Sequence, residues 1–444
     1  MNQFFKFFTA SCLGVFAALV IIGLIFAGFF ASFAGNKPVV PKNTVLELDF
    51  KTMIPELTGN VEVDPLSFEA PENLGLNTIT ALLEHASTDE KVKGILIKGE
   101  RVNAGQATIA TIREAIKGFK DSGKFVYSFA DYYSQSGYYL ASLSDSIYLN
   151  PNGMVDVKGF ATLQPFFKTA LDNMGIKMNV FYAGNFKSAT EPFRRDNMSE
   201  ESKLQTTQFL ESMVSHYNEE VATSRGMTTE ALDNIMSEYK GRDAESSLAS
   251  GLVDRLAYWD EVKTVIRNNM ELKEKKKIKF KSLAKYNNAV KLPSESDADD
   301  KVAVLYAEGL ISYGTTKKGE VNETKYLETL EKIAKDEDIK ALVLRVNSGG
   351  GSSLTSDILW RGIENIKAKG KPVVASFGDY AALTASEDNK KIADSLFSVN
   401  RDTLQKSFTN VCDSVYKIHY DRAVDSIKQL RIDGIKGLID PGKE

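Results

Sequence analysis

The sequence is poor in the residue types on which several kinds of functional site depend. It has only two cysteines, and Cys12 lies inside an apolar run far from Cys412, so a disulfide framework is excluded. Its three histidines, His85, His216 and His419, stand in no motif, which gives a histidine-based hydrolase little support. Neither sign of charge dominates, since 55 basic and 59 acidic residues leave a net charge of −4. Nucleic acid is therefore not expected as a partner, and no metal or cofactor is predicted.

A long apolar run near the N-terminus is the strongest local signal. Residues 7–34 read FFTASCLGVFAALVIIGLIFAGFFASFA and contain no charge. A membrane span needs about 20 apolar residues, whereas the apolar part of a cleaved signal peptide has roughly 7–15. The run therefore favours a transmembrane anchor over a cleaved signal. Its orientation is not fixed by charge, because Lys6 precedes the run and Lys37, Lys42 and Lys51 follow it.

Beyond the run, the chain repeats itself. VKGILIK at 92–98 corresponds to IKALVLR at 339–345, and each is a short apolar run typical of a buried parallel strand. A helical pattern follows each of them, at 109–119 and at 359–366. Five blocks recur in one order about 250 residues apart, which indicates a duplication. The other three pairs are TVLELDF with KVAVLYA, GKFVYSFADY with GKPVVASFGDY, and SDSIYL with ADSLFS.

This repeat defines the predicted organisation of the 444 residues. Alternation of strands and helices predicts an α/β fold with largely parallel sheets. We expect an anchor in residues 1–36, a first α/β unit with a helical extension in 44–286, a polar linker in 287–300 and a second unit in 301–444. The second unit is the shorter one, because GLID at 437–440 follows ADS much more closely than GLVD at 251–254 follows SDS.

A glycine-rich turn in the second unit is one candidate site. RVNSGGGSS at 345–353 stands between a strand pattern and a helix pattern. Glycines let the backbone approach a ligand closely, and free N–H groups at a helix start can hold an anion or a developing oxyanion. A tight turn without any ligand explains the glycines equally well. A phosphate-binding loop is excluded, because the Gly-Lys-Ser/Thr ending is missing.

Lys187 is the second candidate. It follows the apolar segment IKMNVFYAG, which is predicted to be a strand, and it is flanked by Phe186 and Ser188. A lysine at the rim of a core can lose hydration and act as a base toward a serine. An ordinary solvated lysine is the alternative that the residues themselves leave open. We expect Lys187 near a strand end, partly buried, on a groove between the two halves or between subunits.

Together these features resemble signal peptide peptidase A, or protease IV, in its long two-domain form. The segments NFKSATEPFRRDNMS at 185–199 and LVLRVNSGGGSSLTSDILW at 342–360 carry the resemblance. It implies tandem Clp-protease/crotonase-like units after one transmembrane helix, and a serine–lysine dyad that cleaves signal peptides left in the membrane. It also implies a ring-like homo-oligomer with an apolar groove for extended peptides. By this resemblance Lys187 is the general base, and Gly350 and Gly351 supply oxyanion donors.

The chain departs from the family at the nucleophile. After Gly378-Asp379-Tyr380-Ala381-Ala382 the family pattern requires Ser-Gly-Gly-Tyr, but the sequence continues Leu383-Thr384-Ala385-Ser386. Leucine has no nucleophilic atom. The first copy keeps a degenerate version of the motif as SGYY at 136–139.

Two functions remain open at this point. The chain is either a peptidase with a displaced nucleophile or a pseudopeptidase that binds peptides or other subunits without cutting them. Ser386 is the nearest displaced nucleophile, and Ser352 and Ser353 are weaker candidates. The resemblance implies signal peptides and membrane lipid as partners. It also implies a single pass of the inner membrane, with the soluble part on the periplasmic face.

Overall fold

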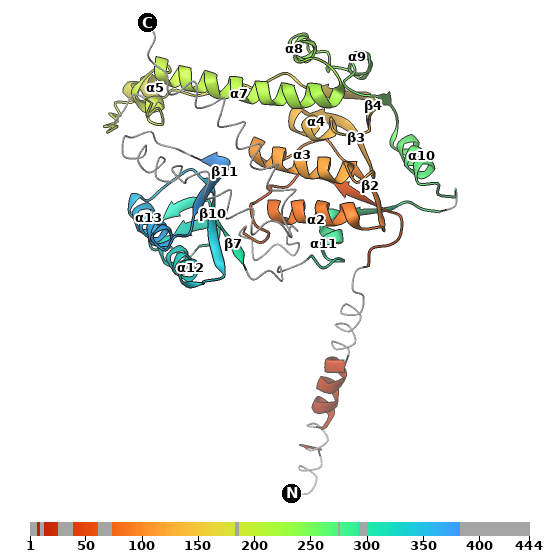
Figure 1. The fold of residues 1–444 in the computed structure, drawn as a ribbon, viewed down its shortest axis with the longest axis horizontal. Coiled ribbons are helices and arrows are strands. Elements are labelled where there is room, and N and C mark those ends of the chain that lie inside the picture. The colour runs from red at the N-terminus through yellow and green to blue at the C-terminus, as the bar shows by residue number, and fades with distance from the viewer. Residues whose placement is uncertain are drawn as a thin grey trace.

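The computed structural model describes residues 7–8, 13–24, 39–60, 73–182, 186–273, 276–292, 300–315 and 317–381. Residues 13–24 of the predicted anchor form a helix. Among the described residues, no helix has both the length and the apolar character needed to cross a membrane. The remaining elements build two larger sheets that lie beside each other (Figure 1) and a short two-stranded sheet. We refer to the part of the chain on the larger sheet as the first unit and to the part on the three-stranded sheet as the second unit.

The first unit is built on a six-stranded parallel sheet with the order β5-β4-β3-β2-β1-β6. Alternate residues of its strands face opposite sides, so Leu46 packs into the main core while Val45 packs against α10. Helices α2 and α3 therefore cover one face and α10 covers the other. The strands are β1 (Thr44–Leu48), β2 (Val92–Ile97), β3 (Phe125–Ser134), β4 (Ser146–Asp156), β5 (Arg255–Leu256) and β6 (Lys279–Ser282).

Ten labelled helices belong to this described part of the first unit. Periodic apolar residues explain the helices that cover the sheet, since Ile109, Ile112 and Ile116 of α3 are all buried. The helices are α2 (Leu76–Thr88), α3 (Gln106–Lys120), α4 (Gln135–Ala141), α5 (Lys168–Asn173), α6 (Glu191–Arg194), α7 (Glu200–Arg225), α8 (Thr229–Ser237), α9 (Ala244–Ala249), α10 (Trp259–Asn269) and α11 (Leu283–Asn287).

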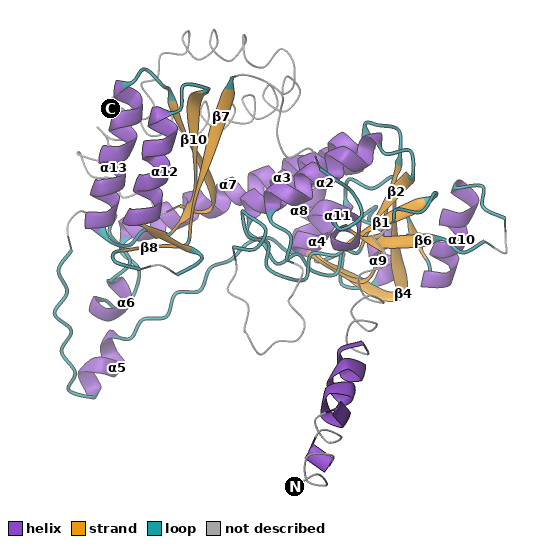
Figure 2. Ribbon diagram, turned by 90° about the horizontal axis from the view of Figure 1, so that it is seen from below, coloured by secondary structure: helices purple, strands orange, loops and turns teal. Residues whose placement is uncertain are grey.

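The second unit has a parallel sheet with the order β11-β10-β7, and a short parallel pair, β8 and β9. Figure 2 shows α12 and α13 together on one side of β7 and β10, where Leu330, Leu342 and Ile366 form a small core. The elements are β7 (Lys301–Glu308), β8 (Leu310–Ser312), β9 (Glu320–Asn322), α12 (Glu323–Lys335), β10 (Ile339–Ser348), α13 (Ser353–Ala368) and β11 (Val373–Ala381).

The two units share a local construction. In each sheet the strand predicted from the repeat, β2 or β10, lies between two parallel neighbours, which confirms the expectation for both segments. In both units the lysine just before β3 or β11 caps the C-terminal end of the helix that precedes the central strand, α2 or α12. Lys124 Nζ donates to the carbonyls of Ala86 and Asp89, each at 2.7 Å. Lys371 Nζ donates in the same way to the carbonyls of Ile333 at 2.6 Å and Asp336 at 2.5 Å.

One sequence-based expectation about secondary structure is wrong. The segment IKMNVFYAG before Lys187 was expected to form a strand, but residues 176–182 are neither helix nor strand. Ile176, Met178 and Phe181 are exposed there, so their apolar pattern does not reflect burial in a sheet of this chain. Apolar side chains predict a strand only when a neighbouring strand is available to pair with it, and no described strand pairs with this segment.

The two units meet through polar contacts. Arg345 of β10 is paired with Glu56 of the first unit, Nη2 to Oε1 at 3.0 Å, and both side chains are largely buried. Glu308 at the end of β7 accepts hydrogen bonds from the Glu56 N–H at 2.9 Å and from Asn60 Nδ2 at 2.6 Å. These contacts join residues about 250 to 290 positions apart, so they fix the junction between the units.

Candidate active site

The glycine-rich turn lies between β10 and α13, as the sequence predicts. Gly350 and Gly351 have φ values of +92° and +153°, which favour glycine. Gly351 also lies against β8, where an ideal Cβ would be 2.0 Å from the Ile311 carbonyl oxygen. The Ile311 N–H donates to the Gly350 carbonyl at 3.0 Å, and the Ser352 N–H donates to the Ile311 carbonyl at 2.8 Å. The turn is therefore held in a defined shape by the short strand beside it.

The N–H groups of this turn differ in their availability. The Gly350 N–H donates to Ser348 Oγ at 3.1 Å, so it is already used inside the turn. The Gly351 N–H donates no hydrogen bond to any described residue. Ser352 Oγ caps α13 by accepting from the Thr355 N–H at 3.2 Å. The pair of oxyanion donors expected from the resemblance stays a prediction, and Gly351 is the one whose N–H binds no other described residue.

Lys187 lies in a loop before α6 and is half-buried. Its ammonium forms no hydrogen bond or ion pair with any described residue, and no described serine hydroxyl contacts it. Partial burial agrees with the expectation for Lys187, whereas its place after a strand does not. Leu383 and Ser386 lie outside the described residues, so the dyad geometry stays a prediction.

Glu191 fixes the segment that contains Lys187. It is fully buried, and it accepts from the Ser199 N–H at 3.1 Å and from Ser199 Oγ at 2.5 Å. Ser199 is the N-cap of α7, because its Oγ accepts from the Ser202 N–H. The segment from Lys187 to Ser199 thus folds back onto the start of α7. An acid in the motif TEPF is visible in the sequence as Glu191, but only the structure shows that its partner is Ser199.

The electrostatics of Glu191 follow from these contacts. Burial opposes ionisation of the carboxyl, but the hydrogen bonds from Ser199 and the positive charges of Arg194 and Arg195 outweigh it and lower the pKa of Glu191. Arg194 Nη2 lies 3.6 Å from Glu191 Oε1, and its guanidinium stacks over the ring of Tyr182 at 3.8 Å. The loop and α6 are therefore held by a charged contact on one side and an aromatic contact on the other.

Many large apolar side chains around this segment are exposed. We call them the apolar arm; they come from the stretch 163–209, on both sides of Lys187 in the sequence. Figure 2 places α5 and α6 toward the end of the molecule where the second unit lies, and Figure 1 shows the same for α5. So many exposed apolar residues in one stretch are typical of a binding surface. The members are Leu163, Phe167, Met174, Ile176, Met178, Phe181, Tyr182, Phe186, Phe193, Leu204 and Phe209.

The degenerate motif of the first unit forms the start of α4. Ser136 Oγ donates to the Val102 carbonyl at 3.3 Å and lies 3.2 Å from Ser134 Oγ. Ser134 caps α4 by accepting from the Gly137 N–H at 3.1 Å. These serines therefore bind backbone and each other, and neither of them is paired with a lysine or histidine among the described residues.

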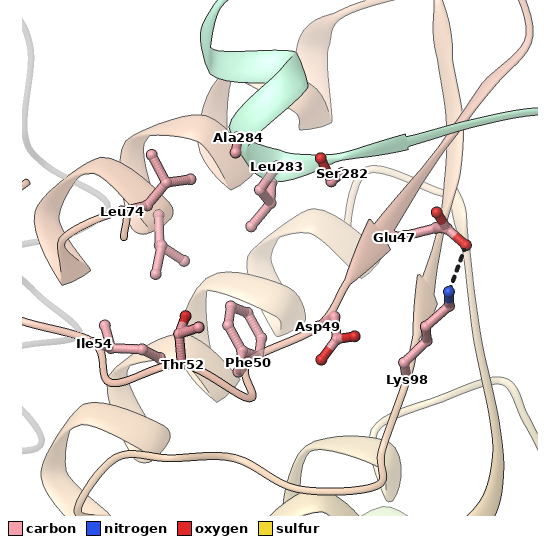
Figure 3. A pocket seen from close by; sticks show the side chains of 11 residues that line it. Glu47, Asp49, Phe50, Thr52, Ile54, Leu74, Lys98, Ser282, Leu283 and Ala284 are labelled. Carbon is pink, nitrogen blue, oxygen red and sulfur yellow. Dashed lines mark ion pairs between the residues drawn. The ribbon is translucent and has the colours of Figure 1, made fainter. Parts of the chain in front are cut away.

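A pocket of about 210 Å³ lies elsewhere, at the carboxyl ends of β1 and β2. Figure 3 shows Glu47 and Lys98 on one side of it, paired at 3.0 Å, and Phe50, Leu74 and Leu283 toward the other side. None of the predicted site residues lines this pocket. It is therefore separate from the site that the sequence predicts.

Comparison with known proteins decides the family. Residues 118–273, which run from the end of α3 to beyond α10 and include Lys187, match Peptidase family S49. The chain is 32% identical over 312 residues to "Protease 4" of Salmonella typhi, covering 68% of this chain and 50% of that protein. The chain belongs to the signal peptide peptidase A family. Its mixed α/β structure with parallel sheets fits the Clp-protease-like fold of that family.

Other relatives agree with the assignment to the signal peptide peptidase A family. "Protease 4" of Haemophilus influenzae is 32% identical over 324 residues, covering 70% of this chain and 52% of the relative. "Serine protease SPPA, chloroplastic" of Arabidopsis thaliana is 25% identical over 331 residues, covering 73% of this chain and 48% of the relative. The chain thus spans about half the length of the curated relatives it matches.

Proposed function

We propose that this chain is a membrane-anchored member of the signal peptide peptidase A family that binds extended peptides, signal peptides above all, without cleaving them. The observation that carries the proposal is Leu383, which stands where the family pattern has its nucleophilic serine. The names of the relatives support a peptidase ancestry. The exposed apolar arm beside Lys187 supports a retained surface for apolar peptides.

The loss of catalysis follows from the geometry that a dyad needs. A hydroxyl and an amine must lie about 2.6–3.2 Å apart, or be joined by one water, for proton transfer. Ser386 is three residues beyond Leu383, and three residues of extended chain span up to about 10 Å. Lys187, which has no serine partner among the described residues, is then left without a hydroxyl to activate.

The proposal includes the arrangement of the chain. The uncharged run at 7–34 serves as a single transmembrane anchor in the inner membrane, with the soluble part on the periplasmic face. Residues 44–286 and 301–444 are two copies of one Clp-protease/crotonase-like unit. The shared strand order and the matched lysines Lys124 and Lys371 support this duplication. The apolar arm also supports a homo-oligomer, since association would cover it.

A peptidase with a displaced nucleophile is the second candidate function. The relatives named as proteases and the presence of Ser386 favour it. Its requirement is that the chain after Ala381 folds so that Ser386 reaches Lys187.

A gain-of-function experiment distinguishes the two candidates. The full chain in detergent micelles is mixed with a signal peptide that carries a fluorophore and a quencher at its two ends. Anisotropy of a singly labelled peptide reports binding, and loss of quenching reports cleavage. We expect binding without cleavage, and cleavage only in Leu383→Ser with Thr384→Gly and Ala385→Gly. Adding Lys187→Ala to that triple variant is the matched control and should abolish the new cleavage. Cleavage by the unmodified chain that is lost in Ser386→Ala would establish the displaced nucleophile instead.

A further inference from the structure

Asp379, at the end of β11, reaches from the second unit to a helix of the first. Its Oδ2 accepts a hydrogen bond from the Gly105 N–H at 2.9 Å, and its Oδ1 accepts one from the Thr108 N–H at 2.8 Å. Gly105 is the N-cap of α3, and it has no side chain with which to cap the helix. The first N–H groups of a helix lack intrahelical partners and favour a negative charge. The cap of α3 is thus a carboxylate supplied by the other unit.

The glycine at this position is required by the approach of Asp379. Gly105 has an ordinary φ of −79°, so its backbone needs no glycine. An ideal Cβ on Gly105 would, however, lie 2.4 Å from Asp379 Cγ and 2.7 Å from its Oδ1. Any larger residue would push the carboxylate off the helix. The two positions are therefore adapted to each other although 274 residues separate them.

The corresponding features of the two units are used differently. Helix α13, which follows the glycine turn of the second unit, is capped by its own Ser352. The acid that corresponds to Asp379 in the first unit is Asp131, which is exposed and accepts from Asn150 Nδ2 at 2.8 Å within its own unit. Among the described residues, a strand-end acid thus caps a helix of the other unit from β11 to α3 but not from β3 to α13.

The end of β11 is also held on its other side. The Tyr380 N–H donates to Asn347 Oδ1 at 2.9 Å, and an ideal Cβ on Gly378 would lie 2.8 Å from Glu56 Oε1. Asp379 lies between these contacts and four residues before Leu383. Its bonds to α3 therefore act on the strand end from which the nucleophile position of the family follows.

We propose that Asp379 is a positioning residue, which caps α3 across the junction and thereby holds the end of β11 against the first unit. The role goes beyond peptide binding and does not depend on it. In this role the N–H groups at the start of α3 form a carboxylate-binding site, which we call the carboxylate cradle, and Asp379 of the same chain occupies it.

Hydrogen exchange of the full chain in detergent, read by mass spectrometry, tests the role. In Asp379→Gly we expect exchange at the start of α3 and at the end of β11 to rise by roughly five- to tenfold, as for a lost helix cap. Sodium formate should restore protection at α3, because a free carboxylate can fill the cradle, but not at β11, because it is not tethered to that strand. Sodium chloride at equal ionic strength should restore neither. Asp379→Asn keeps the shape of the side chain but only one acceptor oxygen, so it should show smaller rises at the same two places, and it replaces the glycine variant if that variant fails to fold.

Two further variants complete the test. Gly105→Ala should raise exchange at the same two places. In the double variant Gly105→Ala, Asp379→Gly, formate should not restore protection at α3. Asp131→Gly is the matched control and should leave both places protected. Unchanged exchange at α3 in both Asp379 variants would overturn the role, and so would formate restoring β11 as fully as α3. Neither result depends on whether the chain binds or cleaves peptides.

Discussion

Arg113 offers the most direct test of how the long helix α7 is held on the first unit. Its side chain is only 1% exposed, and all five of its N–H donors are used. At the end of α4 it donates to the Tyr139 carbonyl, and it also donates to Ser142 Oγ, at a distance of 2.8 Å. It also pairs with Glu220 of α7 at 3.2 Å and donates to Ser224 Oγ at 2.7 Å. One guanidinium on α3 thus joins α4 and α7.

The expected effect of Arg113→Met follows from these contacts. Removing one partner of a buried ion pair costs about 3–5 kcal/mol when the remaining charge stays buried. The Glu220 side chain is 35% exposed and can regain water, so we expect the lower end of that range. A loss of about 3 kcal/mol corresponds to a fall in Tm of roughly 6–12 °C for a unit of this size.

Thermal unfolding of the detergent-solubilised chain, followed by circular dichroism, measures this fall. Lys117→Met is the matched control, because Lys117 is on the same helix but 54% exposed, in an ion pair with Glu114 at 3.9 Å. Its effect should stay within about 0.5 kcal/mol. The Tm of Arg113→Lys should lie between those of Arg113→Met and Lys117→Met, because lysine keeps the charge but lacks the planar set of donors. Equal Tm values for Arg113→Met and Lys117→Met would refute the reasoning, and would leave the docking of α7 to buried apolar residues such as Tyr217 and Val221.

Three further outcomes follow from the candidate site. Gly351→Ala should lower the free energy of unfolding by more than Gly350→Ala, by about 1–3 kcal/mol in the unfolding assay, because only at Gly351 would a Cβ collide with the Ile311 carbonyl. Glu191→Gln should lower Tm at pH 7, and the difference from the unmodified chain should close as the pH falls below about 4.5. The reason is that the pKa of Glu191 is lower in the folded chain than in the unfolded chain. Its carboxylate therefore stabilises the fold at pH values above the unfolded pKa, and this contribution is lost as the pH falls through the folded pKa. Lys187→Ala should change the free energy of unfolding by less than about 0.5 kcal/mol, since its ammonium has no partner among the described residues; a larger loss would mean that it is a structural lysine.

The parts of the fold that could be predicted from the sequence are those with local periodicity. The runs at 92–98 and 339–345 are mainly apolar, apart from an exposed lysine near the start of each, which is typical of buried parallel strands, and the structure forms β2 and β10 there. The spacing of Ile109, Ile112 and Ile116 likewise predicted α3. The turn at 349–351 could also be predicted from its glycines, because a positive φ such as that of Gly350 is rarely adopted by other residues.

Long-range polar contacts could not be predicted in this way. Nothing in GDYA indicates that Asp379 caps a helix 271 residues earlier, and nothing near Glu56 indicates its pairing with Arg345. Such contacts depend on how two units dock, which no local pattern encodes. The failed strand before Lys187 has the opposite cause, since Met178 and Phe181 have the local pattern of a strand but no neighbouring strand among the described residues.

Labelling with a fluorophosphonate probe tests the central claim most directly, because the probe reacts only with an activated serine. The unmodified full chain is incubated with the probe in detergent and analysed by intact mass, with Leu383→Ser, Thr384→Gly, Ala385→Gly as the positive comparison. We predict no labelling of the unmodified chain, and labelling of the triple variant that disappears when Lys187→Ala is added. Stoichiometric labelling of the unmodified chain, lost in Ser386→Ala, would contradict the account and identify this protein as an active peptidase with a displaced nucleophile.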